Sequence, residues 1–153
     1  MIYVGIDPSL SGCGIAVLGR GKPFLRTVST ESKDILYERV DYILGCVMKA
    51  LNRATPDTVA ICIEEPFIHA KHAHGALGII GLGYAIREML YTCGYSWTEV
   101  PVSSLKKFAT GKGNAGKTEV IASVIKRWGA DVKNDNEADA FALAKMAEAG
   151  AKR

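Results

Sequence analysis

The chain opens on an apolar run that ends abruptly in a carboxylate. Residues 2–6 are Ile-Tyr-Val-Gly-Ile, Asp7 follows, and Pro8 and Ser9 then interrupt the extended pattern. This pattern predicts a buried strand with an acid at its tip. Because burying an unpartnered carboxylate costs several kcal/mol, Asp7 needs a partner, and a metal ion at the end of the strand would be one.

The next two apolar runs predict strands that pair with the first. They cover residues 15–18 and 24–29, and the glycines of the intervening Gly19-Arg20-Gly21-Lys22 suit a tight hairpin turn. Because short loops join these strands, the strands must be antiparallel neighbours. The N-terminal stretch is therefore expected to form a meander.

A helix and a different kind of strand follow. Apolar residues recur at spacings of three and four over residues 34–53, which predicts a long helix with one face on the sheet, and Pro56 marks its exit. Residues 58–63 are apolar and rich in β-branched side chains, a pattern typical of a central strand covered on both faces. A strand reached through a helix can run parallel to an earlier one, so we expect Glu64 beside Asp7.

The remaining elements complete an α/β pattern. In the helix expected over 73–91, Gly75, Gly78 and Gly81 share a face, which favours close packing, and a dimer contact is one form of it. The expected fold is a five-stranded mixed sheet, three antiparallel strands then two parallel ones, flanked by helices in a single domain over 1–153. The other elements are a strand over 95–102, a short basic helix over 103–109, and helices over 118–128 and 136–148.

The last helix adds oxygen ligands to the two acids at the strand ends. Asp135, Asn136 and Asp139 fall on one helical face because steps of three and four residues keep direction, whereas Glu137 should point away. Hard oxygen ligands that converge suit Mg²⁺ or Mn²⁺ and not zinc. Two such ions about 3.5 to 4 Å apart can activate a water and stabilise the leaving oxygen of a phosphodiester. The pattern predicts a metal-dependent nuclease.

Composition is compatible with this interpretation. A chain of 153 residues with 48% hydrophobic residues has ample material for one core, and its net charge of +3 permits nucleic-acid binding without requiring it. The four cysteines form no CxxC pair, and three lie in apolar runs, so they are interpreted as reduced core residues. No run is long enough for a signal peptide or a membrane span, and a soluble, cytoplasmic protein is expected.

Four motifs, in order along nearly the whole chain, resemble those of the RuvC-type Holliday junction resolvases, within the ribonuclease H-like superfamily. They are Gly5-Ile6-Asp7-Pro8-Ser9, Ile63-Glu64-Glu65-Pro66-Phe67, Gly111-Lys112-Gly113-Asn114-Ala115-Gly116-Lys117 and Asn136-Glu137-Ala138-Asp139-Ala140-Phe141-Ala142. Each motif alone is weak evidence, but four in the family's order are strong evidence.

The resemblance implies a homodimer that binds four-way DNA junctions and makes paired nicks by two-metal hydrolysis, leaving 5′-phosphate and 3′-hydroxyl ends. Asp7 would bridge two Mg²⁺ ions, Glu64 would hold one and Asp139 the other, and Mn²⁺ could substitute. Phe67 matches the aromatic that the family presses against bases at the junction centre. The basic residues expected at DNA phosphates lie in one lysine-rich segment and are Lys106, Lys107, Lys112 and Lys117.

One position departs from the family pattern. The first acid of the family's last helix is Asn136 here, which offers an oxygen ligand without charge. Asp135 lies four residues before Asp139, so at about 100° per residue the two are about 40° apart around the helix. Asp135 would supply the missing charge. Position favours Asn136 and charge favours Asp135, so both stay candidate metal ligands.

Two other functional classes compete with the nuclease. The neutral Asn136 makes a junction-binding protein with little or no cleavage credible. Residues 111–118 also match the P-loop pattern of nucleotide-binding proteins, but a basic, helix-like segment feeds the loop where a P-loop needs an apolar strand, so no nucleotide cofactor is expected. His69, His72 and His74 are interpreted as part of a basic turn near DNA and not as a metal site.

Overall fold

The structure is a computed structural model, and it describes residues 1–52, 54–66 and 73–150. Its sheet has the strand order β3-β2-β1-β4-β5. β1 pairs antiparallel with β2 and parallel with β4, β2 pairs antiparallel with β3, and β4 pairs parallel with β5. The expected mixed sheet is therefore confirmed. The strands are β1 (Ile2–Asp7), β2 (Cys13–Leu18), β3 (Phe24–Val28), β4 (Val59–Glu64) and β5 (Thr98–Val100).

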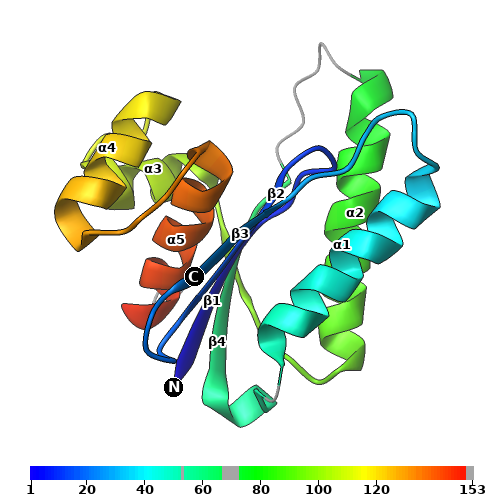
Figure 1. Ribbon diagram of the computed structural model, residues 1–153, viewed down its shortest axis with the longest axis horizontal. Coiled ribbons are helices and arrows are strands. Elements are labelled where there is room, and N and C mark those ends of the chain that lie inside the picture. The colour runs from blue at the N-terminus through cyan, green and yellow to red at the C-terminus, as the bar shows by residue number, and fades with distance from the viewer. Residues whose placement is uncertain (53, 67–72, 151–153) are drawn as a thin grey trace.

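Helices cover both faces of this sheet (Figure 1). α1 and α2 lie on one face, and α5 packs on the other with α3 and α4 outside it. The helices are α1 (Leu36–Leu51), α2 (Ala73–Thr92), α3 (Val102–Thr110), α4 (Lys117–Trp128) and α5 (Asp135–Glu148), with a short 3₁₀ turn, η1 (Pro56–Thr58). Within the part of the chain that the structure describes, no helix combines the length and apolarity that a membrane crossing requires.

The core has two halves, one on each face of the sheet, because successive side chains of a strand point to opposite faces. Val4 and Ile6 of β1 pack with α1 and α2, whereas the side chains of the opposite parity face α5. On the α5 side the buried layer is rich in alanine, so this helix can be buried on most of its circumference. Its buried small residues are Ala138, Ala140, Ala142, Ala144 and Ala147.

Two glycines allow α5 to lie unusually close to the sheet. A Cβ at Gly5 of β1 would collide with the backbone of Ala140 and Ala144, and one at Gly14 of β2 would collide with the carbonyl of Asn136. Neither site has room for a side chain. The approach of backbone to backbone, which glycine permits, sets the height of α5 above β1 and β2.

Two predicted elements differ from those observed. The fifth strand covers only three residues, because Tyr95 and Trp97 lie before it and turn inward to the α1–α2 core. The glycines of α2 also differ in how closely they are packed. A Cβ at Gly78 would contact Leu10, whereas a Cβ at Gly81 would meet no atom within 4 Å among the described residues. Gly78 thus has the predicted packing role, within its own chain.

Other predictions are confirmed. Gly19 and Gly21 adopt φ values of +90° and +86°, as the hairpin turn required. The P-loop-like segment joins two helices, since α3 and not a strand precedes Gly111. All four cysteines are free, and only Cys93 is exposed.

Candidate metal centre and nucleic-acid interface

Asp7 and Glu64 end two adjacent parallel strands on the face that α5 covers. Alternation along β1 places Asp7 on the side of Tyr3 and Gly5, both of which face α5. In β4 the same parity holds for Cys62, which is buried in the α5 cluster, and for Glu64. The strand register pairs Ile6 with Ile63, so the two acids lie at the same level of the sheet.

Burial and neighbouring charge raise the pKa of all three predicted catalytic acids. Burial raises the pKa of Asp7 well above its ordinary value of 3.8, and the charges of Glu64, Asp139 and Asp135 raise it further. Burial, with a smaller contribution from Asp139, raises the pKa of Glu64 to about 7. Burial and then Asp135 raise the pKa of Asp139 to about 6. The structure therefore brings together carboxyl groups whose ionisation is opposed by their neighbours, a site that positive charge would stabilise.

These acids are neighbours without forming a closed cage. Among the residues that the structure describes, no three His, Cys, Asp or Glu side chains group tightly enough to enclose a metal ion. A cage is not what Mg²⁺ requires, because Mg²⁺ keeps several waters and takes one or two carboxylates together with substrate phosphates. The donor set of hard carboxylate oxygens fits such an ion.

The first turn of α5 is held by its own polar residues. The Asn134 side chain caps the helix by accepting from the Glu137 backbone N–H at 2.9 Å, and it also accepts from the Thr27 hydroxyl of β3 at 3.0 Å. Glu137 is buried and accepts from the backbone N–H of Lys133 at 2.9 Å. Glu137 thus anchors the first turn of the helix that carries Asp139, and its charge is not among those that raise the pKa of Asp7, Glu64 or Asp139.

Asp135 and Asn136 have different surroundings. Asp135 forms an ion pair with Lys117, whose hydrogen bond lowers the pKa of Asp135, and its charge reaches both Asp7 and Asp139. The Asn136 amide instead packs against Gly12, where a Cβ would lie 2.7 Å from its Nδ2. Of the two candidates, only Asp135 adds negative charge beside Asp7 and Asp139.

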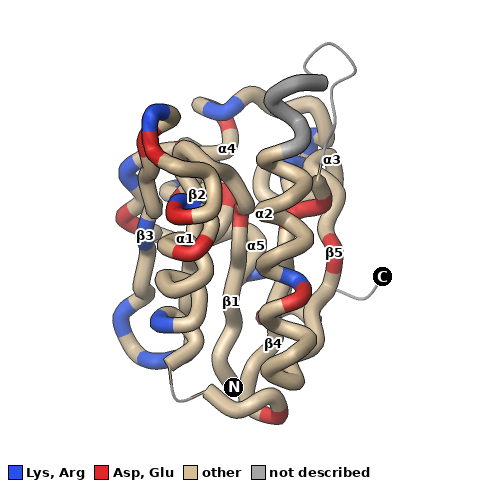
Figure 2. Tube along the Cα trace, turned by 90° about the vertical axis from the view of Figure 1, so that its right-hand side faces the viewer, with Lys and Arg blue, Asp and Glu red and all other residues tan. Residues whose placement is uncertain are grey.

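Two of the four predicted DNA-binding lysines lie near the acids. Lys106 of α3 lowers the pKa of Glu64 and Asp139, and Lys117 lowers that of Asp7 and Asp139. Lys112 pairs with Glu119 at 3.1 Å, and Lys107 is exposed on α3. Figure 2 shows acidic residues ending β1 and β4, with basic residues of α3 at the same end of the molecule. Phe67 and the side chains of the three histidines lie outside the described residues.

A cavity of about 470 Å³ lies on the side of Lys106, and none of Asp7, Glu64 and Asp139 lines it. It lies between the end of β4, the start of α3 and the glycine loop, and its lining includes one basic side chain, Lys106, and one acidic side chain, Glu65. Its other lining residues are small or apolar: Pro66, Pro101, Val102, Ser103 and Gly113. The cavity shares Lys106 with the acidic site, because Lys106 also lowers the pKa of Glu64 and Asp139.

Comparison with known proteins gives the family. The family model described as crossover junction endodeoxyribonuclease RuvC matches residues 3–146. The chain belongs to the RuvC family. Its relatives include the crossover junction endodeoxyribonucleases RuvC of Rickettsia prowazekii (strain Madrid E) and Rickettsia typhi (strain ATCC VR-144 / Wilmington), which are 33% and 34% identical to it, with 94% of both chains covered in each case.

Solved RuvC structures have the same fold. The Thermus thermophilus RuvC structure matches with a TM-score of 0.71 at 26% identity, covering 98% of this chain and 97% of that one. T. thermophilus RuvC in complex with Holliday junction substrate gives a TM-score of 0.74 at 24% identity, covering 94% and 90%. The fold of this RuvC-family chain is thus ribonuclease H-like, and the family's nucleases are divalent-metal enzymes.

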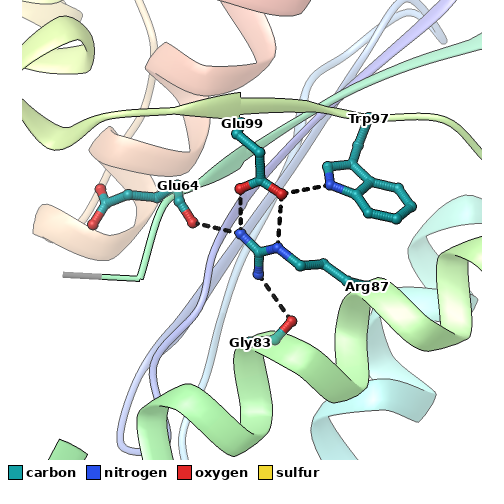
Figure 3. Close-up of polar contacts among 5 residues, drawn as sticks. All are labelled: Glu64, Gly83, Arg87, Trp97 and Glu99. Atoms are coloured by element: carbon teal, nitrogen blue, oxygen red, sulfur yellow. Dashed lines mark hydrogen bonds and ion pairs between the residues drawn. The ribbon is translucent and has the colours of Figure 1, made fainter. Parts of the chain in front are cut away.

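Sequence reasoning missed one polar network of this RuvC-family chain. Arg87 of α2 pairs with Glu99 of β5, and Trp97 donates its indole N–H to the same carboxylate at 2.6 Å (Figure 3). The signals were a lone arginine within the apolar helix 73–92 and an acid inside a strand pattern. Either one alone also fits a solvated surface residue, so neither stood out.

Proposed function

We propose that this protein is a Mg²⁺-dependent, structure-selective DNA endonuclease that cuts four-way junctions by paired nicks. The observation that carries the proposal is the convergence of Asp7, Glu64 and Asp139, from two strands and one helix, into a site where the charges of Glu64 and Asp139 raise the pKa of Asp7. The names of its relatives, crossover junction endodeoxyribonucleases, support the same substrate class. The expected products carry 5′-phosphate and 3′-hydroxyl ends.

The catalytic and metal-holding roles fall to the three acids. Asp7 would bridge two divalent ions, Glu64 would hold one and Asp139 the other. When bound, such ions activate a water and stabilise the leaving oxygen of the phosphodiester. The central place of Asp7, whose pKa responds to both Glu64 and Asp139, supports its role as the shared ligand. Mn²⁺, with similar ligand preferences, is expected to substitute for Mg²⁺.

For the fourth ligand we favour Asp135. Its charge acts on Asp7 and Asp139, whereas Asn136 packs against Gly12. Lys117 holds Asp135 in an exposed ion pair, and a DNA phosphate arriving at Lys117 would compete with that carboxylate. Substrate binding would then free Asp135 for the metal.

DNA would reach the acids over the basic side of the site. Lys106 and Lys117 are close enough to place phosphates beside the carboxylates, and Lys107 and Lys112 would contact the backbone farther out. The start of α4 adds backbone N–H groups after the glycine loop, a favourable setting for phosphate. Phe67 would stack on bases at the junction centre.

A homodimer would supply the two sites that paired nicks require. Tyr84 and Tyr91 stand two turns apart on α2 and are 70% and 77% exposed, an unusual display for large aromatic residues of one helix face. We expect a dimer by sedimentation equilibrium, and replacing Tyr84 with Lys should shift the mass toward the monomer. A wild-type protein that remains monomeric at micromolar concentration would contradict this part of the proposal.

Cleavage of a labelled junction tests the function. Purified protein is incubated with a four-way junction labelled on each strand in turn, with Mg²⁺, Mn²⁺ or EDTA. We expect symmetric nicks that DNA ligase can reseal, and their loss in Asp7→Asn purified in parallel, with junction binding retained. Binding without cutting in either metal would falsify the nuclease and favour the junction-binding alternative. ATP turnover that Lys117→Ala abolishes would favour the P-loop alternative.

A further inference from the structure

The carboxyl end of β4 is held from the α2 face of the sheet by one guanidinium group. Arg87 Nη2 donates to the backbone carbonyl of Glu64 at 3.2 Å, and Nη1 donates to the carbonyl of Gly83 at 2.8 Å within α2. Nε and Nη2 also donate to the two carboxylate oxygens of Glu99, at 2.8 and 2.5 Å. Figure 3 shows the guanidinium between these partners, with the Glu64 side chain directed away from it.

The pair between Arg87 and Glu99 has the geometry of a fixed element and not of a surface contact. Their side chains are 13% and 21% exposed, and the two hydrogen bonds are bidentate. Trp97 fixes Glu99 from the other side. Removing one partner from a largely buried ion pair leaves an uncompensated charge, so neither residue is readily dispensable.

The peptide unit that follows Glu64 is held at both of its polar groups. Its carbonyl accepts from Arg87, and its N–H, that of Glu65, donates to the carbonyl of Val100 at 2.9 Å. The next residue, Pro66, has no N–H and contributes no further ladder bond. The strand end is therefore fixed at one peptide, and that peptide adjoins the Cα from which the Glu64 carboxylate projects.

We propose that Arg87 is a positioning residue for the metal ligand Glu64. Arg87 does not touch the carboxylate, which lies on the α5 face of β4. It holds the Glu64 main chain from the α2 face and so sets the direction of the side chain toward Asp7 and Asp139. Glu99 and Trp97 orient the guanidinium in turn. This inference rests on the proposed nuclease function, because only a metal site gives the position of Glu64 its importance.

Three variants distinguish positioning from general stability. Arg87→Met removes both the positive charge and all of the guanidinium N–H donors. Arg87→Lys keeps the charge, but a single ammonium group cannot hold both carboxylate oxygens of Glu99 together with the Glu64 and Gly83 carbonyls. Val47→Ala, at a fully buried position on α1, is the control that lowers the melting temperature while leaving the Arg87 hydrogen bonds in place.

Two measurements are made on each full-length protein. The first is Mn²⁺ binding without DNA, followed by the loss of the free-ion paramagnetic resonance signal, and the second is the Mn²⁺ concentration for half-maximal junction cutting. We expect both arginine variants to weaken Mn²⁺ binding and to raise the half-maximal concentration about tenfold, as mutation of groups that orient metal ligands does. Val47→Ala should leave both values unchanged at a comparable loss of melting temperature.

The outcomes separate this inference from the proposed function. Wild-type Mn²⁺ binding in Arg87→Met or in Arg87→Lys would overturn the positioning role. An equal shift in Val47→Ala would also overturn it, because the effect would then follow stability alone. A wild-type protein that binds no Mn²⁺ and cuts no junction would instead refute the nuclease proposal.

Discussion

Replacing Glu64 with Gln should stabilise the metal-free protein while it destroys the activity. In the folded protein, burial and the neighbouring Asp139 raise the pKa of Glu64 from its ordinary value of 4.5 to about 7. The charged form is thus disfavoured in the folded state relative to the unfolded chain. Above pH 7, where Glu64 is ionised in both states, its charge opposes folding. Glutamine has nearly the same shape and no charge, so in the variant no charge at position 64 opposes folding.

The size and the pH window follow from the two pKa values. The shift of 4.5 to about 7 corresponds to about 3 kcal/mol of lost stability at pH 8, at about 1.4 kcal/mol per pKa unit. The loss develops as the pH rises from 4.5 toward 7, because only there does the folded protein bind more protons than the unfolded chain. At pH 5 the cost falls below about 1 kcal/mol. For a chain of this length, about 3 kcal/mol corresponds to a rise in melting temperature of roughly 6–12 °C.

Thermal melts followed by circular dichroism provide the assay. Wild type, Glu64→Gln and Glu88→Gln are melted in EDTA at pH 5 and pH 8 and again at pH 8 with Mg²⁺. Glu88 is exposed on α2 and is the matched control. We expect Glu64→Gln to melt higher than wild type at pH 8, with a much smaller difference at pH 5. Mg²⁺ should raise the melting temperature of wild type more than that of the variant, because Mg²⁺ binds the ionised site.

Either of two results would contradict a carboxylate at Glu64 that opposes folding. One is a Glu64→Gln protein that melts at or below the wild-type temperature at pH 8 in EDTA, which would mean that the carboxylate is not opposed by burial and neighbouring charge. The other is a stabilisation that is equal at pH 5 and pH 8, which would assign the effect to packing and not to ionisation.

Three further predictions concern other parts of the molecule. Gly5→Ala should destabilise the protein by roughly 3 kcal/mol or more in denaturant titration, because its Cβ would meet the α5 backbone, whereas Gly81→Ala should be neutral or stabilising; equal melts would contradict the close approach of α5. Asp135→Asn should raise the metal concentration for half-maximal cutting, and Asn136→Asp should lower it by adding charge; a shift in Asn136→Asp alone would move the fourth ligand to position 136. Phe67→Ala should impair junction cleavage and spare binding to linear duplex, and equal loss on both substrates would remove its stacking role.

The strands and the strand-end acids could be predicted because their signals are local. An apolar run that stops at a carboxylate specifies both the strand and its polar tip, and the helix between the runs makes parallel pairing of β1 with β4 possible. The same logic placed Asp139 by helical spacing. These inferences depend on periods of two and 3.6 residues, which the sequence displays directly.

The remaining features depend on long-range contacts that no local pattern carries. β5 is shorter than the predicted strand over 95–102, and Trp97, which precedes β5, packs against the α1–α2 core. The choice between Asp135 and Asn136 depends on where Lys117 and Gly12 lie, and both residues are distant in the chain. The partnership of Arg87 with Glu99 likewise appears only when α2 and β5 are side by side.

The closeness of α5 to the sheet has a consequence for how the enzyme is made. Asp7 and Glu64 leave the ribosome before α5, the helix that carries Asp139, the third proposed metal ligand. On the proposed function, a nascent chain would lack its complete set of acids until α5 docks on the bare backbone at Gly5 and Gly14. Nuclease activity should emerge only with the fully formed domain, so incomplete chains would pose no threat to the cell's DNA.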